Sequence, residues 1–395
     1  MMNPPVNALS RDLARAMQEA WSHLDADRIV ITGSGKMFVA GADIREIERI
    51  TKRELPPDMS YLNELLNRIE SSGKLVVMAM NGGALGIGLE LAMAGHYRIA
   101  ASSSQLGLPE VKLGLIPGAG GTQRLPRLAG LEAAMRMCVT GEVIEANEAL
   151  RLGIVDELAV GNVVERALQI EKGRRTDQIL CSGIADAGKW REIAAPRQRS
   201  PLRVIEAICA AAASGSFEAG LAVESQQFRE ALLDSQARAM VHLFFAEREI
   251  GKVPMLAKHV APASLEDVRV VDREIEIEAC GKCRLRISPT ENGARVMEVR
   301  YEAGMKPETL AAALQYAKHQ GKLAVVVQGN QWIGKTDLDA ATGTRYLAEG
   351  RVLRESDIDV LMVRGYGYPE ELGGPMHAYS TTPSQISESL REPLK

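Results

Sequence analysis

The apolar stretch from Leu75 to Gly95 constrains the fold of this chain more than any other segment. Its length would suit a membrane-spanning helix, but it contains Asn81, Glu90 and five glycines. Glycine-rich breaks around a single acid are typical of a strand, a tight turn and a helix that follow one another inside a folded core. We therefore expect no membrane segment and no membrane partner.

The segments around this stretch alternate between strand and helix patterns. Short apolar runs at 28–32, 74–80 and 96–101 predict buried strands, and helical spacing of apolar residues marks 9–24 and 58–71. This alternation indicates an α/β architecture. After about residue 160 the composition changes: 172–200 is polar and basic, 203–250 is helical and rich in alanine, and 255–345 contains short strands. A chain of 395 residues has room for two or three domains.

Composition excludes several classes of partner. The net charge is −4 and only 4% of the residues are aromatic, so neither phosphate neutralisation nor base stacking is favoured, and no nucleic acid is expected. The first residues lack the pattern of a secretory signal, and the five cysteines form no evident disulfide framework. These features predict a reducing, cytoplasmic location.

Two glutamates in the segment 81–130 are candidates for acid–base chemistry. Glu90 lies in the first turn of a predicted helix after a glycine-rich bend, and Glu110 follows Pro109 on a predicted loop before a second glycine-rich bend. Two neighbouring carboxyls can hold one proton between them, because like-charge repulsion keeps one of them protonated. Free N–H groups of the glycine bends can stabilise an oxyanion. A helix-dipole partner and an ordinary loop residue would explain the same glutamates without any chemistry.

Five motifs in order carry a family resemblance. They are PPVNALS at 4–10, IVITGSGKMFVAGADIREI at 29–47, ALGIGLELAM at 84–93, GLPEVKLGLIPGAGGTQRLPR at 107–127 and TGEVIEANEALRLGIVDEL at 140–158. Through them, residues 4–160 resemble the enoyl-CoA hydratase/isomerase (crotonase) superfamily, especially the hydratase part of bifunctional enoyl-CoA hydratase/3-hydroxyacyl-CoA dehydrogenases. The resemblance implies a crotonase-like spiral of β-β-α units over 1–170. A linker and helical segment over 171–253 and a small α/β remnant of a dehydrogenase over 254–395 would follow.

The resemblance also implies a reaction, the addition of water to a 2-enoyl-CoA to give a 3-hydroxyacyl-CoA, as in the β-oxidation of fatty acids. Glu90 would then activate the water, and Glu110 would protonate the α-carbon. The N–H groups of Ala42 and Ile87 would form the oxyanion hole. Isoleucine replaces the usual glycine there, and it can serve only if its φ is negative. The residues implied in binding the substrate and its CoA group are Ala40, Ala42, Asp43, Ile44, Arg45, Gly86 and Gly118.

Other functions stay open at this stage. Δ3-Δ2-enoyl-CoA isomerisation could use the same site, and a non-catalytic acyl-CoA-binding or assembly subunit is suggested by Ile87 and by the absence of the β-hairpin that usually precedes PPVNALS. No G-x-G-x-x-G follows residue 253, so dehydrogenase activity is not expected. We expect no cofactor beyond the CoA of the substrate, no metal, and either a homo-oligomer or a monomer.

Two downstream motifs suggest other chemistry but have simpler explanations. GNQWIGKT at 329–336 matches a phosphate-binding loop, yet its interior is bulky, and an ordinary strand–loop explains it equally well. Cys280 and Cys283 fit the two sides of a hairpin turn, and no second pair of cysteines offers the further ligands that zinc needs. The six histidines show no ligand spacing.

Overall fold

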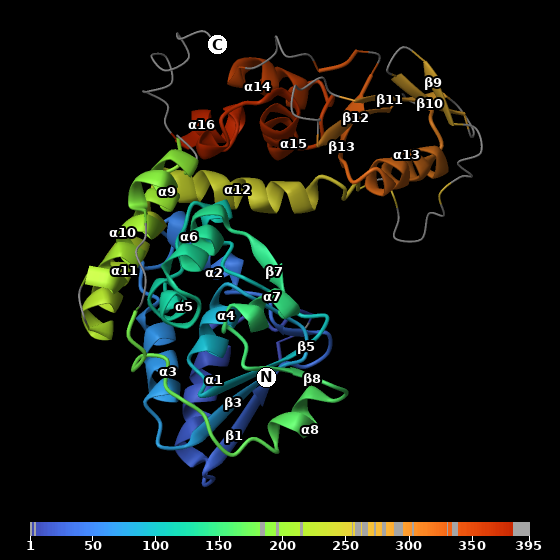
Figure 1. The fold of residues 1–395 in the computed structure, drawn as a ribbon. Helices are drawn as coiled ribbons and strands as arrows, with labels where there is room; N and C mark the ends of the chain where they lie inside the picture. The colour runs from blue at the N-terminus through green and yellow to red at the C-terminus, as the bar shows by residue number, and fades with distance from the viewer. Residues whose placement is uncertain are drawn as a thin grey trace. The chain divides into compact units, whose positions relative to one another are not determined.

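The contacts of the chain divide it into two units, Met1–Arg238 and Ala239–Lys395, in the computed structural model (Figure 1). The structure describes residues 2–3, 5–181, 186–194, 197–213, 216–254, 256, 262, 268–271, 274–278, 282–287, 295–301, 304–329, 331–333 and 339–381. The division falls inside the helical segment 203–250. The three-part division expected from the sequence stays a prediction.

Two four-stranded sheets form the centre of the first unit. One contains β1 (Arg28–Thr32), β3 (Leu75–Met80), β5 (Tyr97–Ala101) and β8 (Glu157–Ala159), all parallel. The other contains β2 (Met37–Val39), β4 (Gly83–Leu85), β6 (Gln105–Gly107) and β7 (Val143–Glu145), of which only β7 runs antiparallel to its neighbour. The pairs β1–β2, β3–β4 and β5–β6 each place their first strand in one sheet and their second in the other, while β7 and β8 follow in the reverse order with α7 between them. This is the expected spiral of β-β-α units.

Helices cover these sheets, and local sequence explains where they begin. Ser10 caps the first helix through the N–H of Leu13, and Asp43 caps α2 through the N–H of Arg45. The helices up to α8 are α1 (Arg11–His23), α2 (Ile44–Thr51), α3 (Ser60–Glu70), α4 (Ile87–Met93), α5 (Gly121–Ala129), α6 (Leu131–Thr140), α7 (Ala146–Arg151) and α8 (Val163–Ala167), with the 3-10 helix η1 (Glu110–Leu113). Apolar residues of β3, β5 and α8 form one of the buried clusters between sheet and helix.

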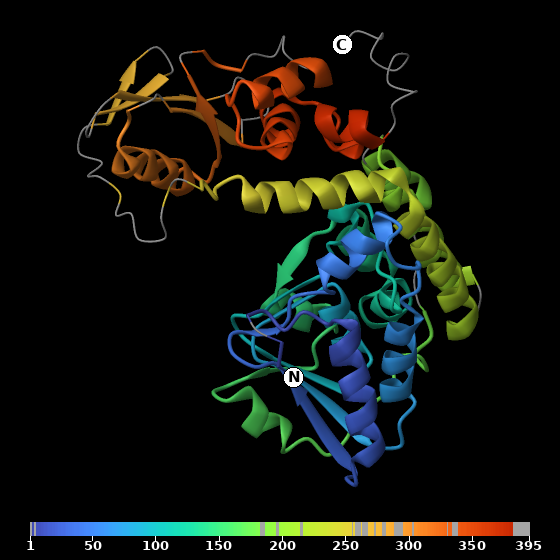
Figure 2. The ribbon, with the colours of Figure 1, turned by 180° about the vertical axis from the view of Figure 1, so that it is seen from behind.

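The helices that follow residue 186 join the first unit. They are α9 (Ala187–Ile193), α10 (Ser200–Ala213) and α11 (Phe217–Leu233), and α12 (Ser235–Glu249) runs across the division. α10 packs on α5, α6 and α11, while α11 also packs on α2 and α5 (Figure 2). The predicted helices of 203–250 are confirmed, and α10 and α11 belong to the body that contains the two sheets.

The second unit has its own sheet and core. The strand order is β13 (Leu323–Gln328), β12 (Val296–Tyr301), β11 (Lys282–Ile287), β10 (Glu274–Glu278) and β9 (Val268–Val271), and only β12 and β13 pair in parallel. The remaining elements are α13 (Pro307–His319), α14 (Ala340–Ala348), α15 (Glu355–Val360), the π-helical turn η2 (Leu361–Gly365), the 3-10 helix η3 (Glu370–Leu372) and α16 (Pro375–Thr381). The alternating run 274–287 forms two antiparallel strands. Cys280 lies outside the described residues, as do Asn330, Gly334, Lys335 and Thr336 of GNQWIGKT.

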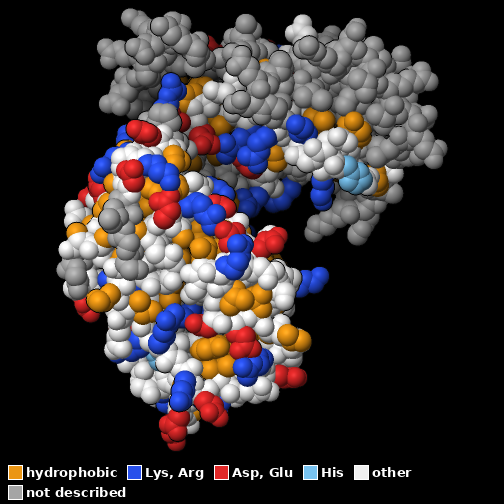
Figure 3. Space-filling view, in the orientation of Figure 1, with side chains coloured by type: hydrophobic (Ala, Val, Ile, Leu, Met, Phe, Trp, Pro, Cys, Tyr) orange, Lys and Arg blue, Asp and Glu red, His pale blue; other side chains and the backbone are white. Residues whose placement is uncertain are grey.

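Figure 3 shows basic and acidic side chains interspersed over the visible face of the first unit, as a small net charge suggests. No helix of the described part of the chain combines the length and the apolar character needed to cross a bilayer.

Candidate active site

The turn that leads into α4 places Glu90 inside the first unit. Gly86 follows β4 at φ 55° and ψ −128°, a conformation outside the regions that L-residues favour. Gly88 lies against β2, since a Cβ there would be 2.3 Å from the carbonyl oxygen of Val39. The two glycines thus permit a sharp turn and a close approach. Glu90, in the first turn of α4, is only 2% exposed.

The Glu90 carboxyl is bound by main-chain amides. Its Oε1 accepts hydrogen bonds from the N–H of Ala119 and of Gly121, both at 2.8 Å. Gly121 is the first residue of α5, so the positive end of that helix faces the carboxyl. Burial raises the pKa of Glu90 above its ordinary value, while the two amides and the charge of Arg124 lower it. These donors stabilise the carboxylate form.

Glu110 has the opposite surroundings. It begins η1 directly after Pro109, where a loop was predicted. Its Oε1 is 2.9 Å from the place that a Cβ on Gly86 would take, and its buried Oε2 has no hydrogen-bond partner among the described residues. Burial raises the pKa of Glu110 well above the ordinary value, and the charges of Glu90 and Glu224 raise it further. The surroundings therefore favour the protonated acid.

The structure thus brings the two predicted glutamates together and gives them surroundings that favour different protonation states. They interact strongly enough that the charge of Glu90 is the second largest cause of the raised pKa of Glu110. Such a pair titrates as a unit, and the two amide donors favour the ionised form at Glu90 over the ionised form at Glu110. A proton acceptor and a proton donor at one buried place can act on the two ends of a double bond.

Two amide groups beside the pair have free donor capacity. Ile87 is the first residue of α4, where the helix leaves its N–H without an intrahelical partner, and its φ is not positive. The N–H of Ala42 follows Gly41, whose Cα is 3.8 Å from the place of a Cβ on Gly86. Neither N–H donates to another described residue. The backbone condition set for Ile87 as a donor is met, while the oxyanion role of both amides stays a prediction.

The other predicted binding residues lie on the same loops. Ala40 donates its N–H to the carbonyl of Val6 at 3.2 Å, and the Asp43 side chain is used to cap α2, at 3.0 Å from the N–H of Arg45. Ile44 and the exposed Arg45 form the first turn of α2. Ala42 and Asp43 therefore lead directly into the first turn of α2, which contains Ile44 and Arg45. Their part in binding CoA stays a prediction.

Gly118 lies at the start of the loop that binds Glu90. Its carbonyl accepts a hydrogen bond from the side chain of Asn63 at 2.9 Å. A Cβ on Gly118 would be 2.5 Å from the ring of Phe228 on α11. Gly118 is therefore packed between α3 and α11, beside the Glu90 carboxyl.

Sequence reasoning did not single out α11, although it contributes a third buried carboxyl. Glu224 is fully buried and accepts hydrogen bonds from the N–H of Gly120 at 2.5 Å, the N–H of Thr122 at 2.9 Å and the hydroxyl of Thr122 at 2.6 Å. Burial and the charge of Glu90 raise the pKa of Glu224 to about 8. The clue in the sequence was its place on the buried stripe of Phe217, Gly220 and Ala231, at helical spacing.

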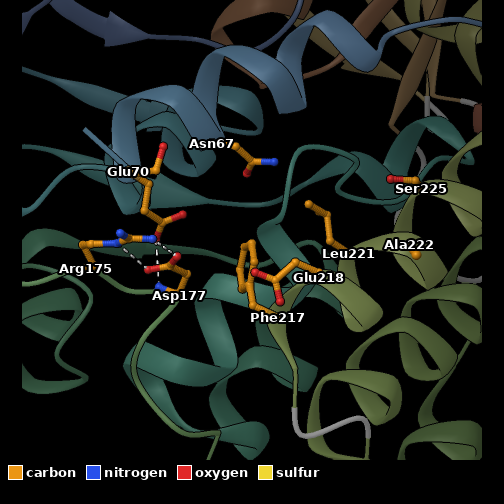
Figure 4. A pocket seen from close by; sticks show the side chains of 10 residues that line it. Asn67, Glu70, Arg175, Asp177, Phe217, Glu218, Leu221, Ala222 and Ser225 are labelled. Carbon is orange, nitrogen blue, oxygen red and sulfur yellow. Dashed lines mark hydrogen bonds and ion pairs between the residues drawn. The ribbon is translucent and has the colours of Figure 1, made fainter. Parts of the chain in front are cut away.

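A buried ion pair supports the same loop from the other side. Arg124 of α5 donates to Glu70 Oε2 at 2.7 Å and to the carbonyl of Ala119 at 2.7 Å. Oε1 of Glu70 accepts the N–H of Asp177, whose carboxylate pairs with Arg175 (Figure 4). These groups line a cavity of about 390 Å³ between α3 and α11, and neither Glu90 nor Glu110 lines it. The complete lining is Asn67, Glu70, Ser71, Arg175, Asp177, Phe217, Glu218, Leu221, Ala222 and Ser225.

No cluster of three or more His, Cys, Asp or Glu side chains suited to a metal ion occurs in the described part of the chain. The sequence showed no metal-ligand spacing among the histidines. In the second unit, His242 of α12 pairs with Asp359 at 2.9 Å and stacks on His377. Within the first unit, the site consists of carboxyls and amides alone.

Comparison with known proteins adds the family. Residues 1–176 match the family described as Enoyl-CoA hydratase/isomerase. A glyoxysomal fatty acid beta-oxidation multifunctional protein of Brassica napus is 36% identical over 299 residues, which are 69% of this chain and 41% of the relative. A peroxisomal bifunctional enzyme of Danio rerio is 38% identical over 271 residues, 64% of this chain and 37% of the relative. The crystal structure of an enoyl-CoA hydratase from Bacillus anthracis is 30% identical, with a TM-score of 0.40, and the match covers 60% of this chain and 87% of that one.

The alternating strand pairs and covering helices give the first unit an α/β, crotonase-like fold. Residues 1–176 form a domain of the enoyl-CoA hydratase/isomerase (crotonase) superfamily, and the relatives of this chain include proteins named as multifunctional or bifunctional enzymes of β-oxidation. It spans about two fifths of the length of those relatives. Their names place them in peroxisomes or glyoxysomes, so they lend no support to the predicted cytoplasmic location.

Proposed function

We propose that the first unit adds water to the double bond of a 2-enoyl-CoA thioester and releases a 3-hydroxyacyl-CoA. The observation that carries this proposal is the different hydrogen bonding of the two buried carboxyls. Glu90 accepts hydrogen bonds from two main-chain amides, whereas Oε2 of Glu110 has no hydrogen-bond partner among the described residues. Hydration of a conjugated thioester needs one ionised and one protonated group at the same place. The family supports the substrate class.

The reaction uses each group in the state that its surroundings favour. The Glu90 carboxylate takes a proton from water, and the water oxygen bonds to C3 of the enoyl group. The electron pair of the double bond moves toward the thioester oxygen, where the N–H groups of Ala42 and Ile87 would stabilise the negative charge. Glu110 then gives its proton to C2. One proton has entered at Glu90 and one has left Glu110, so proton exchange with solvent restores the starting state.

The test is the loss of enoyl absorbance in the presence of the purified chain. Glu90→Gln and Glu110→Gln should each lower kcat by a factor on the order of 10² to 10⁴, the usual contribution of a positioned acid or base. The exposed Glu64, changed to Gln, is the matched control and should leave kcat unchanged. Undiminished hydration in the double variant of Glu90 and Glu110 would contradict the proposed roles.

The other functions considered from the sequence are outcomes of the same experiment. Double-bond migration that depends on Glu110 but survives Glu90→Gln would add an isomerase activity. Binding of acyl-CoA without turnover of any enoyl-CoA would replace the enzyme by a non-catalytic binding subunit. The non-positive φ of Ile87 and its N–H at the start of α4 favour the enzyme, because the substitution leaves the donor intact.

We also propose that this chain has no 3-hydroxyacyl-CoA dehydrogenase activity and uses no cofactor beyond the CoA of its substrate. The support is the absence of a G-x-G-x-x-G sequence after residue 253, because that turn binds the cofactor pyrophosphate in dinucleotide-binding domains. Reduction of NAD with a 3-hydroxyacyl-CoA as substrate would contradict this. A homo-oligomer stays a prediction, which light scattering of the purified chain tests.

A further inference from the structure

Four successive amides of one turn are divided between two buried carboxyls. The N–H groups of Ala119 and Gly121 bind Glu90, while those of Gly120 and Thr122 bind Glu224. The turn therefore lies between α4 and α11, with alternate amides pointing to opposite sides. Both carboxyls are at most 2% exposed.

We propose that Glu224 is a positioning residue for hydration: it holds the turn 119–122 so that the two amides on the other side fix the catalytic carboxylate of Glu90. This inference rests on the proposed function. Glu224 makes its bonds to the turn and to the hydroxyl of Thr122, so it acts on Glu90 through the main chain.

The packing of α11 makes this support rigid. Gly220 allows the helix to approach α5 closely, since a Cβ there would be 2.0 Å from Oε1 of Gln123. The amide nitrogen of Gln123 donates to the Thr122 hydroxyl at 2.9 Å and to the Ala207 carbonyl of α10 at 3.0 Å. About two turns further along α11, Phe228 packs on Gly118. Three points of contact thus hold the helix against the loop that carries the donors.

The charge of Glu224 also acts on the pair directly. The titratable groups that interact with it are Glu90 from α4, Glu110 from η1 and Cys138 from α6. Above the pKa of Glu224, which is about 8, its negative charge raises the pKa of Glu110 and helps that acid to keep its proton. A neutral residue at 224 would remove this effect.

The test replaces Glu224 by Gln, which keeps the shape of the side chain. One carboxylate oxygen becomes an NH2 group, which cannot accept the hydrogen bonds that the turn donates. We expect kcat for hydration to fall on the order of tenfold or more, with KM changed less than about twofold, because the altered group does not touch the substrate. The alkaline limb of kcat/KM should move to lower pH. Glu230→Gln on the same helix, at an exposed position, is the matched control and should change neither.

A merely structural role would lower the active fraction and leave the pH profile in place, so an unmoved alkaline limb or an unchanged kcat in Glu224→Gln overturns the inference. Should that variant not fold, Thr122→Val removes the hydroxyl donor alone, and it should lower kcat several-fold while Thr122→Ser restores it. Wild-type rates in Thr122→Val then overturn the inference. A wild-type chain without hydratase activity would instead refute the proposed function.

Discussion

Replacing Gly86 by alanine tests whether the position of the Glu110 carboxyl affects the rate independently of the stability of the fold. At φ 55° and ψ −128°, an L-residue stores strain on the order of 1–3 kcal/mol. In addition, the new methyl carbon would be 2.9 Å from Oε1 of Glu110, so the carboxyl must move by a few tenths of an ångström. Because a misplacement of about 1 Å can cost about 100-fold in rate, a shift of this size should lower kcat by about tenfold.

The assay measures hydration kcat beside the free energy of unfolding in urea, and it needs a control glycine that also has a positive φ. Gly161 lies between β8 and α8 at φ 84°, and no atom lies within 4 Å of a Cβ placed there. Gly161→Ala should therefore destabilise the unit by about 1 kcal/mol without changing kcat. Wild-type kcat in Gly86→Ala, or an equal loss of kcat in Gly161→Ala, would refute the reasoning.

Three further outcomes follow from buried charges. Arg124→Met should destabilise the first unit by about 3–5 kcal/mol in urea unfolding, because it leaves Glu70 buried and unpaired. The pKa of Glu224 in the folded chain, about 8, lies above its value in the unfolded chain. The stabilisation from its protonated form is therefore complete below the unfolded pKa and is lost as the pH rises toward 8. Glu224→Gln should make the fall of the unfolding free energy with pH shallower, by up to about 1.4 kcal/mol per pH unit. His242→Gln should weaken the second unit in thermal unfolding, since it removes the ring that pairs with the fully buried Asp359 and leaves only main-chain donors to that carboxyl among the described contacts, and it should leave hydration kcat unchanged.

The longer elements of the first unit were predictable, and the shorter ones were not. The runs at 28–32, 74–80 and 96–101 became β1, β3 and β5 within a residue of the expected bounds. The second sheet was not predicted from the sequence, because β2, β4, β6 and β7 have three residues each, which is too few to show a periodic pattern. In addition, β4 begins with a glycine. Tertiary pairing, rather than local propensity, makes these segments strands.

The site was predictable in part for a related reason. Glu90 follows one glycine-rich bend and Glu110 precedes another within one continuous segment, so their common place could be inferred locally and from the resemblance. Glu224 lies more than a hundred residues beyond Glu110 on a helix whose docking no local pattern reveals. Only its position among buried apolar neighbours distinguished it from a surface glutamate.

The different chemistry of the two predicted glutamates comes from the main chain around them. Both are buried, and burial alone would raise both pKa values and keep both groups neutral. Two amides at the start of α5 and the charge of Arg124 oppose this effect at Glu90, and no hydrogen-bond donor among the described residues opposes it at Oε2 of Glu110. The loop between η1 and α5 therefore favours ionisation of Glu90 over that of Glu110. Changes in that loop should alter the pH profile even where both glutamates are kept.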